Sequence, residues 1–293
     1  MKRSLPRAAL IALAAAAAAS LTTAPAGAGV RARTVTVKAP VVLGFTYLNG
    51  TVVESAALVE GRPFRRGGME LRGTYAPPDF GGRFTLFDGR GRLSGRAEMS
   101  TADGVGFSGP LTVAGGGGRY AHATGRLRFR GVLDTDSVPG VTVLPGLLSG
   151  RLRVRPAPAG PGFRTPVKVN LEGKGAKVRF LELSANPFAA KLTSAQATAM
   201  DRFGKGVLIE TDDVREGTRL RPKVVTWYGP NGTWSAKGTT NLDTGPAGSD
   251  PLTVTRGTGR FRGAHGTLAY TLLTDPSVNE LEISRIRGRL RFP

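Results

Sequence analysis

Short runs in which apolar and polar residues alternate dominate this chain, and glycine or proline separates one run from the next. The three clearest runs are 126–130, 151–155 and 285–292, where arginine stands at every second position in each of them. Successive side chains of a strand point to opposite faces, so each run predicts a strand with one arginine face and one apolar face. This alternation is typical of antiparallel sheets that cover a core on one side. We therefore expect an all-β protein whose sheets close around an apolar interior.

Two Asn-Gly pairs lie between strand-like runs and predict hairpins. Asn49-Gly50 precedes Thr51-Val52-Val53, and Asn231-Gly232 follows the run 224–228. Asn-Gly suits the two positive-φ positions of a type I′ turn, so we expect these pairs to form the turns themselves.

One segment of the chain favours a short helix. Ala195 to Phe203 is rich in alanine, Thr193 or Ser194 could cap its start, and Gly204 could end it.

The chain contains an internal duplication. A shift of 141 residues aligns Pro110–Leu127 with Pro251–Leu268, with ten of eighteen positions identical. The same register, without a gap, aligns Thr85 with Thr226 and Asp134 with Asp275. A shared register over about fifty residues indicates a repeated structural unit.

The first 28 residues predict an export signal. A basic start is followed by an apolar run over residues 8–21, and small residues allow cleavage after Ala26 or Ala28. We therefore expect a secreted, extracellular protein. No later segment has the roughly twenty apolar residues that a membrane-spanning helix needs.

A segment rich in proline and glycine separates the two repeats. We place the linker at 157–165, the first domain at 29–156 and the second at 166–293, because this composition continues neither sheet.

The segment Gly257-Thr-Gly-Arg-Phe261-Arg-Gly-Ala-His-Gly266 resembles the glycine-rich hallmark of dirigent proteins and allene oxide cyclases. Gly116–Gly125 is a weaker match, and Thr124 and His265 stand where dirigent proteins usually carry arginine. The resemblance implies an eight-stranded antiparallel barrel with an apolar cavity, here in two tandem copies. Dirigent proteins steer the coupling of phenoxy radicals and the cyclases close a ring, while related barrels form dimers or trimers, so an oligomer is compatible with the resemblance.

The composition narrows the class of protein. The chain has a formal net charge of +20 and no cysteine, which excludes disulfides. The lack of cysteine and the bias toward alanine, glycine and arginine fit a bacterial protein from a GC-rich genome. The arginine faces are either solvated surfaces or a binding site for an anionic cell-surface polymer. Nucleic acid is disfavoured because aromatic residues are not interleaved with the arginines.

Candidate site residues come from the aromatic and ionisable side chains. Core packing is the default for the aromatic residues, and the alternative is that some of them line a ligand pocket. Conventional catalysis has little support, and we expect neither a metal site nor a cofactor. Asp134 and Asp275 are either turn residues or rim carboxylates, and His265 is either a solvated turn residue or a functional group. Asp212-Asp213 is interpreted as a loop. The candidates for ligand binding are Trp227, Trp234, Tyr270 and Phe261, and those for catalysis are Asp275, His265 and Asp134.

Three functions are compatible with these residues. The leading hypothesis is a secreted protein that binds a hydrophobic small molecule in a barrel, the second in particular, without a conventional catalytic site. The alternatives are a dirigent- or cyclase-type enzyme that shapes a reactive intermediate and an arginine-rich protein that binds a cell-surface polyanion.

Overall fold

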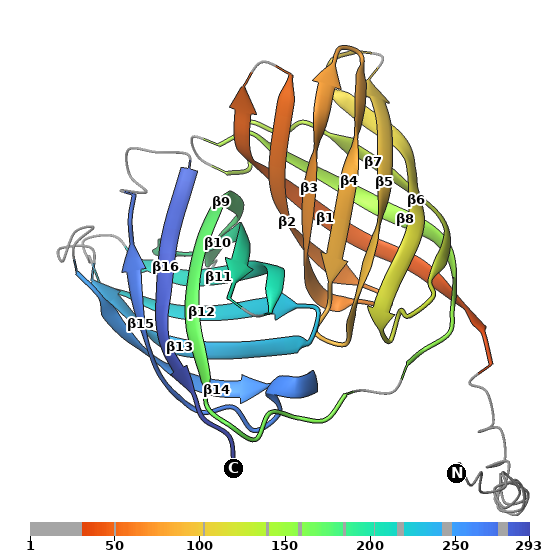
Figure 1. Cartoon of the computed structure of the whole chain (residues 1–293). Coiled ribbons are helices and arrows are strands. Elements are labelled where there is room, and N and C mark those ends of the chain that lie inside the picture. Colours follow the sequence, from red (N-terminus) through yellow and green to blue (C-terminus); the bar gives the residue numbers. More distant parts are fainter. Residues whose placement is uncertain are drawn as a thin grey trace, which may run out of the picture. The chain divides into compact units, whose positions relative to one another are not determined.

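Two closed antiparallel barrels of eight strands each make up the part of the chain that the structure describes (Figure 1). The computed structural model describes residues 31–293 except 50, 102, 139–140, 158–159, 184–185, 202, 216–219, 242–247 and 275–280. The prediction of an all-β protein with two tandem eight-stranded barrels is confirmed. The predicted export signal lies outside the described residues.

The first barrel joins its strands in chain order, and the last strand pairs with the first. Its strands are β1 (Arg33–Asn49), β2 (Val52–Gly61), β3 (Arg65–Ala76), β4 (Asp79–Phe87), β5 (Gly91–Thr101), β6 (Gly106–Gly118), β7 (Thr124–Val132) and β8 (Val143–Val154).

The second barrel repeats this order and closes by pairing its last strand with its first. Its strands are β9 (Val167–Leu183), β10 (Asn186–Met200), β11 (Gly204–Arg215), β12 (Leu220–Gly229), β13 (Gly232–Asn241), β14 (Asp250–Gly257), β15 (Gly266–Leu272) and β16 (Leu281–Leu290).

The predicted alternation of arginine and apolar residues is confirmed in all three runs. Leu127 and Phe129 of β7 are buried, whereas the arginines on either side of them are exposed. Leu152 and Val154 of β8 follow the same rule. In a closed barrel every strand alternates between interior and exterior, so the inward phase of each strand supplies the core.

Both predicted hairpins exist, but the turn of each is shifted by one residue. Asn49 belongs to β1 and pairs with Val52, so the prediction of an Asn49-Gly50 turn is wrong. Gly229 pairs with Gly232, so Pro230 and Asn231 form the turn, and the prediction of an Asn231-Gly232 turn is wrong. Gly232 has φ 135° and lies against the backbone of Thr258, so the close approach of two backbone segments requires this glycine.

The predicted helix from Ala195 to Phe203 is wrong, because most of this segment belongs to β10. Ala195 pairs with Ala176 of β9 and with Ile209 of β11, so hydrogen-bonded strands flank it on both sides. Helix propensity is a weak preference, and two complete ladders outweigh it here. The helical structure in the described residues is the short 3-10 turn η2 (Gly259–Phe261).

The duplicated glycine motifs close one end of each barrel in the same way. Gly118 and Gly259, which are 141 residues apart, have φ values of 60° and 59°. They precede Tyr120 and Phe261, which are fully buried. The left-handed glycine turns the chain so that the aromatic ring two residues later enters the barrel end.

Candidate functional site

An apolar cavity of about 490 Å³ lies in the first barrel. Inward-facing side chains of several strands line the cavity, together with residues of the connecting segments. The side chains that form its walls are almost all aliphatic or aromatic, with Thr142 and the hydroxyl of Tyr75 as polar exceptions. They are Leu43, Phe45, Val53, Leu71, Tyr75, Phe80, Met99, Phe107, Leu133, Val141, Thr142 and Leu144 of the first barrel, together with Gly104 and with Leu281 of β16. The volume falls within the range of about 300–1000 Å³ that is typical of small-molecule sites.

A buried hydroxyl without a partner stands beside the wall of this cavity. Ser55 of β2 is 1% exposed, and its Oγ atom has no hydrogen-bond partner. It occupies the inward phase of β2, two residues after Val53, and its cross-strand partners Phe45 and Leu71 both line the cavity. An unpaired buried hydroxyl costs free energy, so a ligand group that hydrogen-bonds to it would gain affinity.

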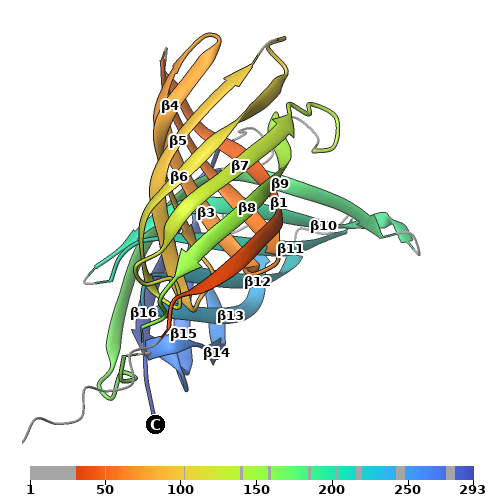
Figure 2. The ribbon, with the colours of Figure 1, turned by 90° about the vertical axis from the view of Figure 1, so that its right-hand side faces the viewer.

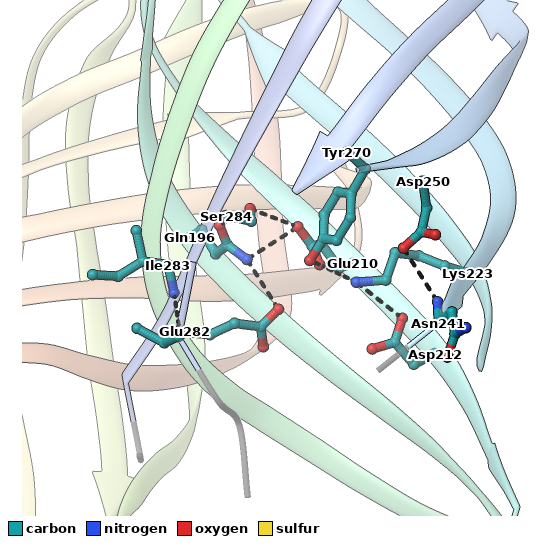
Figure 3. A network of polar contacts seen from close by, with 11 residues as sticks. Gln196, Glu210, Asp212, Lys223, Asn241, Asp250, Tyr270, Glu282, Ile283 and Ser284 are labelled. Carbon is teal, nitrogen blue, oxygen red and sulfur yellow. Dashed lines mark hydrogen bonds and ion pairs between the residues drawn. The ribbon is translucent and has the colours of Figure 1, made fainter. Parts of the chain in front are cut away.

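The interior of the second barrel holds a network of charged and polar side chains (Figure 3). Lys223 of β12 lies with its Nζ atom 2.9 Å from Oε2 of Glu210 and 3.5 Å from Oδ1 of Asp212, both on β11. The Tyr270 hydroxyl donates to Oε2 of Glu210 at 2.9 Å, and Nζ of Lys223 lies 3.8 Å from the centre of the Tyr270 ring.

Gln196 extends this network toward β16. Its Nε2 group donates to Oε1 of Glu210 at 3.0 Å and to Oε1 of Glu282 at 3.2 Å. Oγ of Ser284 lies 2.7 Å from Oε1 of Gln196 and 3.0 Å from Oε1 of Glu210. Glu210 therefore accepts hydrogen bonds from Gln196, Lys223, Tyr270 and Ser284, and these donors stabilise its ionised form.

The carboxyl groups of the network differ in acidity. Burial alone would raise the pKa of Glu210, but the Lys223 ammonium and the surrounding hydrogen bonds outweigh it and hold this pKa below its usual value. Burial and then repulsion from Glu210 raise the pKa of Glu282 well above its usual value. Burial also raises the pKa of Asp212, although Lys223 opposes this shift. Glu210 and Asp212 share the Lys223 ammonium, and the pKa of Glu210 is lowered while that of Asp212 is raised.

A small polar void lies next to the network. It measures about 10 Å³ and is lined by Asp212, Arg221 and Thr240, among others. Oδ1 of Asp212, Nε of Arg221 and Oγ1 of Thr240 are buried and make no hydrogen bond. The void has the size of a single-water site, and these three atoms supply the polar partners that such a site needs.

Strand register shows that the apolar cavity and the polar void occupy equivalent positions. The shift of 141 residues aligns Phe84 with Val225. Leu71 is the strand partner of Phe84, and Glu210 is the strand partner of Val225, so Leu71 corresponds to Glu210. The same shift aligns the cross-strand pair Phe80–Met99, which lines the cavity, with the pair Arg221–Thr240, which lines the void. Leu144 corresponds to Glu282 in the same way, since they pair with Leu43 and Gly175, which occupy matching positions of β1 and β9. The same interior position is therefore apolar and hollow in one barrel, and charged and nearly filled in the other.

The aromatic residues suggested for ligand binding lie in the core of the second barrel. Trp227, Trp234, Tyr270 and Phe261 are all 0% exposed. The Trp227 ring lies 6.5 Å from Trp234 and 5.7 Å from Phe261, measured between ring centres, and its Nε1 group donates to Thr198. Tyr270 belongs to the charged network, while the other three pack against one another. A ligand-binding role for these four residues stays a prediction.

The residues suggested for catalysis are not brought together. Oδ1 of Asp134 accepts from the backbone amides of Asp136 and Ser137, both at 2.9 Å, and the Ser137 amide in particular lowers the pKa of Asp134. This is the geometry of a turn residue. His265 is exposed and its Nδ1 atom lies 3.2 Å from the Gly263 carbonyl oxygen. Asp275 lies outside the described residues.

Sequence reasoning missed the charged network, and it misread Asp212. Asp212-Asp213 is part of strand β11 and not a loop; Asp212 points inward and Asp213 pairs with exposed Lys191. A signal was present, because Glu210 and Asp212 follow Leu208 at every second position and share its inward phase. Among the described residues, no group of three His, Cys, Asp or Glu side chains could hold a metal ion.

Comparisons with protein-family models, with curated proteins and with solved structures found no match. The resemblance to dirigent proteins and allene oxide cyclases therefore stays a prediction. Fold and interior together define a tandem β-barrel protein with one hollow apolar barrel and one barrel built around a buried charged network. In the described part of the chain, no helix is long and apolar enough to cross a membrane.

Proposed function

We propose that the protein is exported and binds a hydrophobic small molecule inside its first barrel. The observation that carries this proposal is the cavity of about 490 Å³, whose lining is almost wholly apolar. Burial of apolar ligand surface there contributes about 25 cal/mol for each Å² removed from water. A dirigent-like origin of the barrels is part of the same proposal.

Ser55 refines the class of ligand. The bound molecule carries a hydroxyl or carbonyl group that hydrogen-bonds to Oγ of Ser55 once the neighbouring side chains of Phe45 and Leu71 shift, since Ser55 lies behind these lining residues; the rest of the molecule is apolar. A purely hydrocarbon ligand would leave this hydroxyl unsatisfied. The favoured class is therefore a lipid-like or aromatic molecule with one polar end.

The first barrel is better suited to a ligand than the interior around the charged network. The void at the equivalent position of the second barrel measures about 10 Å³, which is too small for an organic molecule. For the same reason the cyclase alternative has less support, since the buried carboxyl groups at this void leave no room for a substrate.

The test measures binding of a neutral apolar fluorophore, N-phenyl-1-naphthylamine, by its fluorescence enhancement. Val53→Phe and Leu144→Phe each add bulk to a wall of the cavity. Either substitution should weaken binding about tenfold or more, a loss of about 1.4 kcal/mol. The matched control is Val132→Phe, because Val132 is 56% exposed and does not line the cavity.

Thermal unfolding must show that all three variants fold before their affinities are compared. Native affinity in both cavity variants would refute binding in this barrel. A Ser55→Ala variant should bind the fluorophore normally but lose about 0.5–1.5 kcal/mol of affinity for a long-chain alcohol. Native mass spectrometry of the protein secreted by its own host should reveal an adduct that is released on denaturation.

A further inference from the structure

A row of exposed arginines crosses the outer face of the first barrel. Strand register places Arg72 of β3 opposite Arg83 of β4, and Arg83 opposite Arg96 of β5. The row continues through Thr112 of β6 to Arg126 of β7 and Arg151 of β8. Figure 2 shows β4 to β8 side by side on this face. We call these five arginines the arginine row.

The row sets like charges against one another. Residues directly opposite in an antiparallel pair have Cβ atoms about 4.5–5.5 Å apart, and like charges there destabilise the sheet. All five arginines are exposed. In the part of the chain that the structure describes, Arg72 alone has a carboxylate within 4 Å, at 2.9 Å from Glu54. Charge compensation within the chain is therefore nearly absent along the row.

The second barrel offers an internal comparison. The equivalent outward row runs through Thr211, Val224, Lys237, Thr253, Thr267 and Arg289, which contain two basic residues where the first barrel has five. A barrel of this kind therefore folds without an arginine row. The basic row is a feature of the first barrel, although both halves of the chain have a similar excess of basic residues.

We propose that the arginine row binds a flexible, linear polymer of phosphate groups. Six neighbouring strands at about 4.8 Å each extend the row over about 24 Å, which a single phosphate cannot span. Arginine binds phosphate oxygens through two parallel N–H groups, and its charge is permanent. The outer face of a barrel is convex, so a flexible chain can follow the row, whereas a flat bilayer would contact a few of its members. This inference is independent of ligand binding inside the barrel.

The test compares two variants with the same change in net charge. In the row variant, glutamine replaces Arg83, Arg96, Arg126 and Arg151. In the control variant, glutamine replaces four exposed arginines of the second barrel, namely Arg256, Arg262, Arg289 and Arg291. Affinity for long-chain inorganic polyphosphate is measured on the full chain between about 50 and 200 mM salt.

We expect wild type to bind polyphosphate and the row variant to bind at least about tenfold more weakly. The slope of log affinity against log salt should fall by about one for each arginine that contacts a phosphate. The control variant should stay within about twofold of wild type. Polyphosphate should also raise the unfolding temperature of wild type more than sodium chloride of equal ionic strength, because it relieves repulsion in the row.

Equal loss in both variants would overturn the proposal, since net charge alone would then explain binding. Native affinity in a folded row variant would overturn it as well. Oligothymidylate tests whether the bases contribute to binding. No aromatic side chain lies in the row to stack on a base, so oligothymidylate and polyphosphate should bind with equal affinity per phosphate group. Binding to phosphatidylglycerol vesicles without binding to polyphosphate would assign the row to a membrane surface and refute the proposal.

Discussion

Leu144 of the first barrel and Glu282 of the second occupy the same position in two copies of one fold. Leu144 pairs with Leu43, and Glu282 pairs with Gly175 at the matching place. Leu144 lines the apolar cavity, whereas Glu282 accepts a hydrogen bond from Gln196 in the charged network. The duplicated barrels have therefore diverged in their interiors while they kept the same strand register.

The raised pKa of Glu282 predicts a specific pH dependence of stability. Folded Glu282 holds its proton more tightly than the unfolded chain does, so its contribution is fully present below the ordinary pKa of 4.5. That contribution is lost as the pH rises through the folded-state pKa, by at most about 1.4 kcal/mol for each pH unit. Glu282→Gln, which is neutral at every pH, should remove this fall. Urea unfolding of both proteins across this pH range measures the difference.

Glu210→Gln is the matched control, because Glu210 is the ionised partner of Lys223 and its pKa is lowered. It should cost about 3–5 kcal/mol, since it leaves a buried ammonium without its closest carboxylate. If the stability of Glu282→Gln instead depends on pH as that of wild type does, Glu282 is not the group whose raised pKa causes the fall.

Trp227→Ala should act on stability. The Trp227 side chain is fully buried between Trp234 and Phe261, so its removal leaves a large cavity and should cost about 3–5 kcal/mol. Because Trp227 does not line the cavity of the first barrel, the fluorophore affinity of the folded fraction should be unchanged. Denaturant unfolding and fluorophore titration on the same variant separate the two effects. If folded Trp227→Ala instead binds the fluorophore clearly more weakly than wild type, the binding site lies in the second barrel.

Gly259→Ala should destabilise the second barrel. Gly259 has φ 59°, and a Cβ atom there would meet the backbone of Asn231 and Gly232. Left-handed backbone costs other residues about 1–2 kcal/mol, so we expect a loss of about 2 kcal/mol or more with the added clash. The thermal midpoint should fall by about 4 °C or more.

Gly81→Ala provides the control for this substitution, because no atom lies within 4 Å of a Cβ atom at Gly81. It should leave the midpoint nearly unchanged. Equal effects of the two substitutions would show that the left-handed turn at Gly259 is not needed for the closed barrel end.

The features that could be predicted from the sequence are local or repeated. The phase of Leu127 and Phe129 against their arginines depends on neighbouring residues, and the structure confirms it. The helix expected from Ala195 failed because propensity competes there with two strand ladders that come from other parts of the chain. The turn at Asn231 failed by one residue because Gly232 lies against a distant backbone segment.

The sequence by itself determined the class of fold and the repeat, because alternation, turn residues and the register of 141 residues are written along the chain. The tertiary structure decided which interior is hollow. Leu71 and Leu144 face one apolar space, and Glu210 and Glu282 share one network, although more than seventy residues separate the members of each pair. Closure of eight strands brings these side chains together, and the free energy of burying them depends on neighbours that no local pattern reveals.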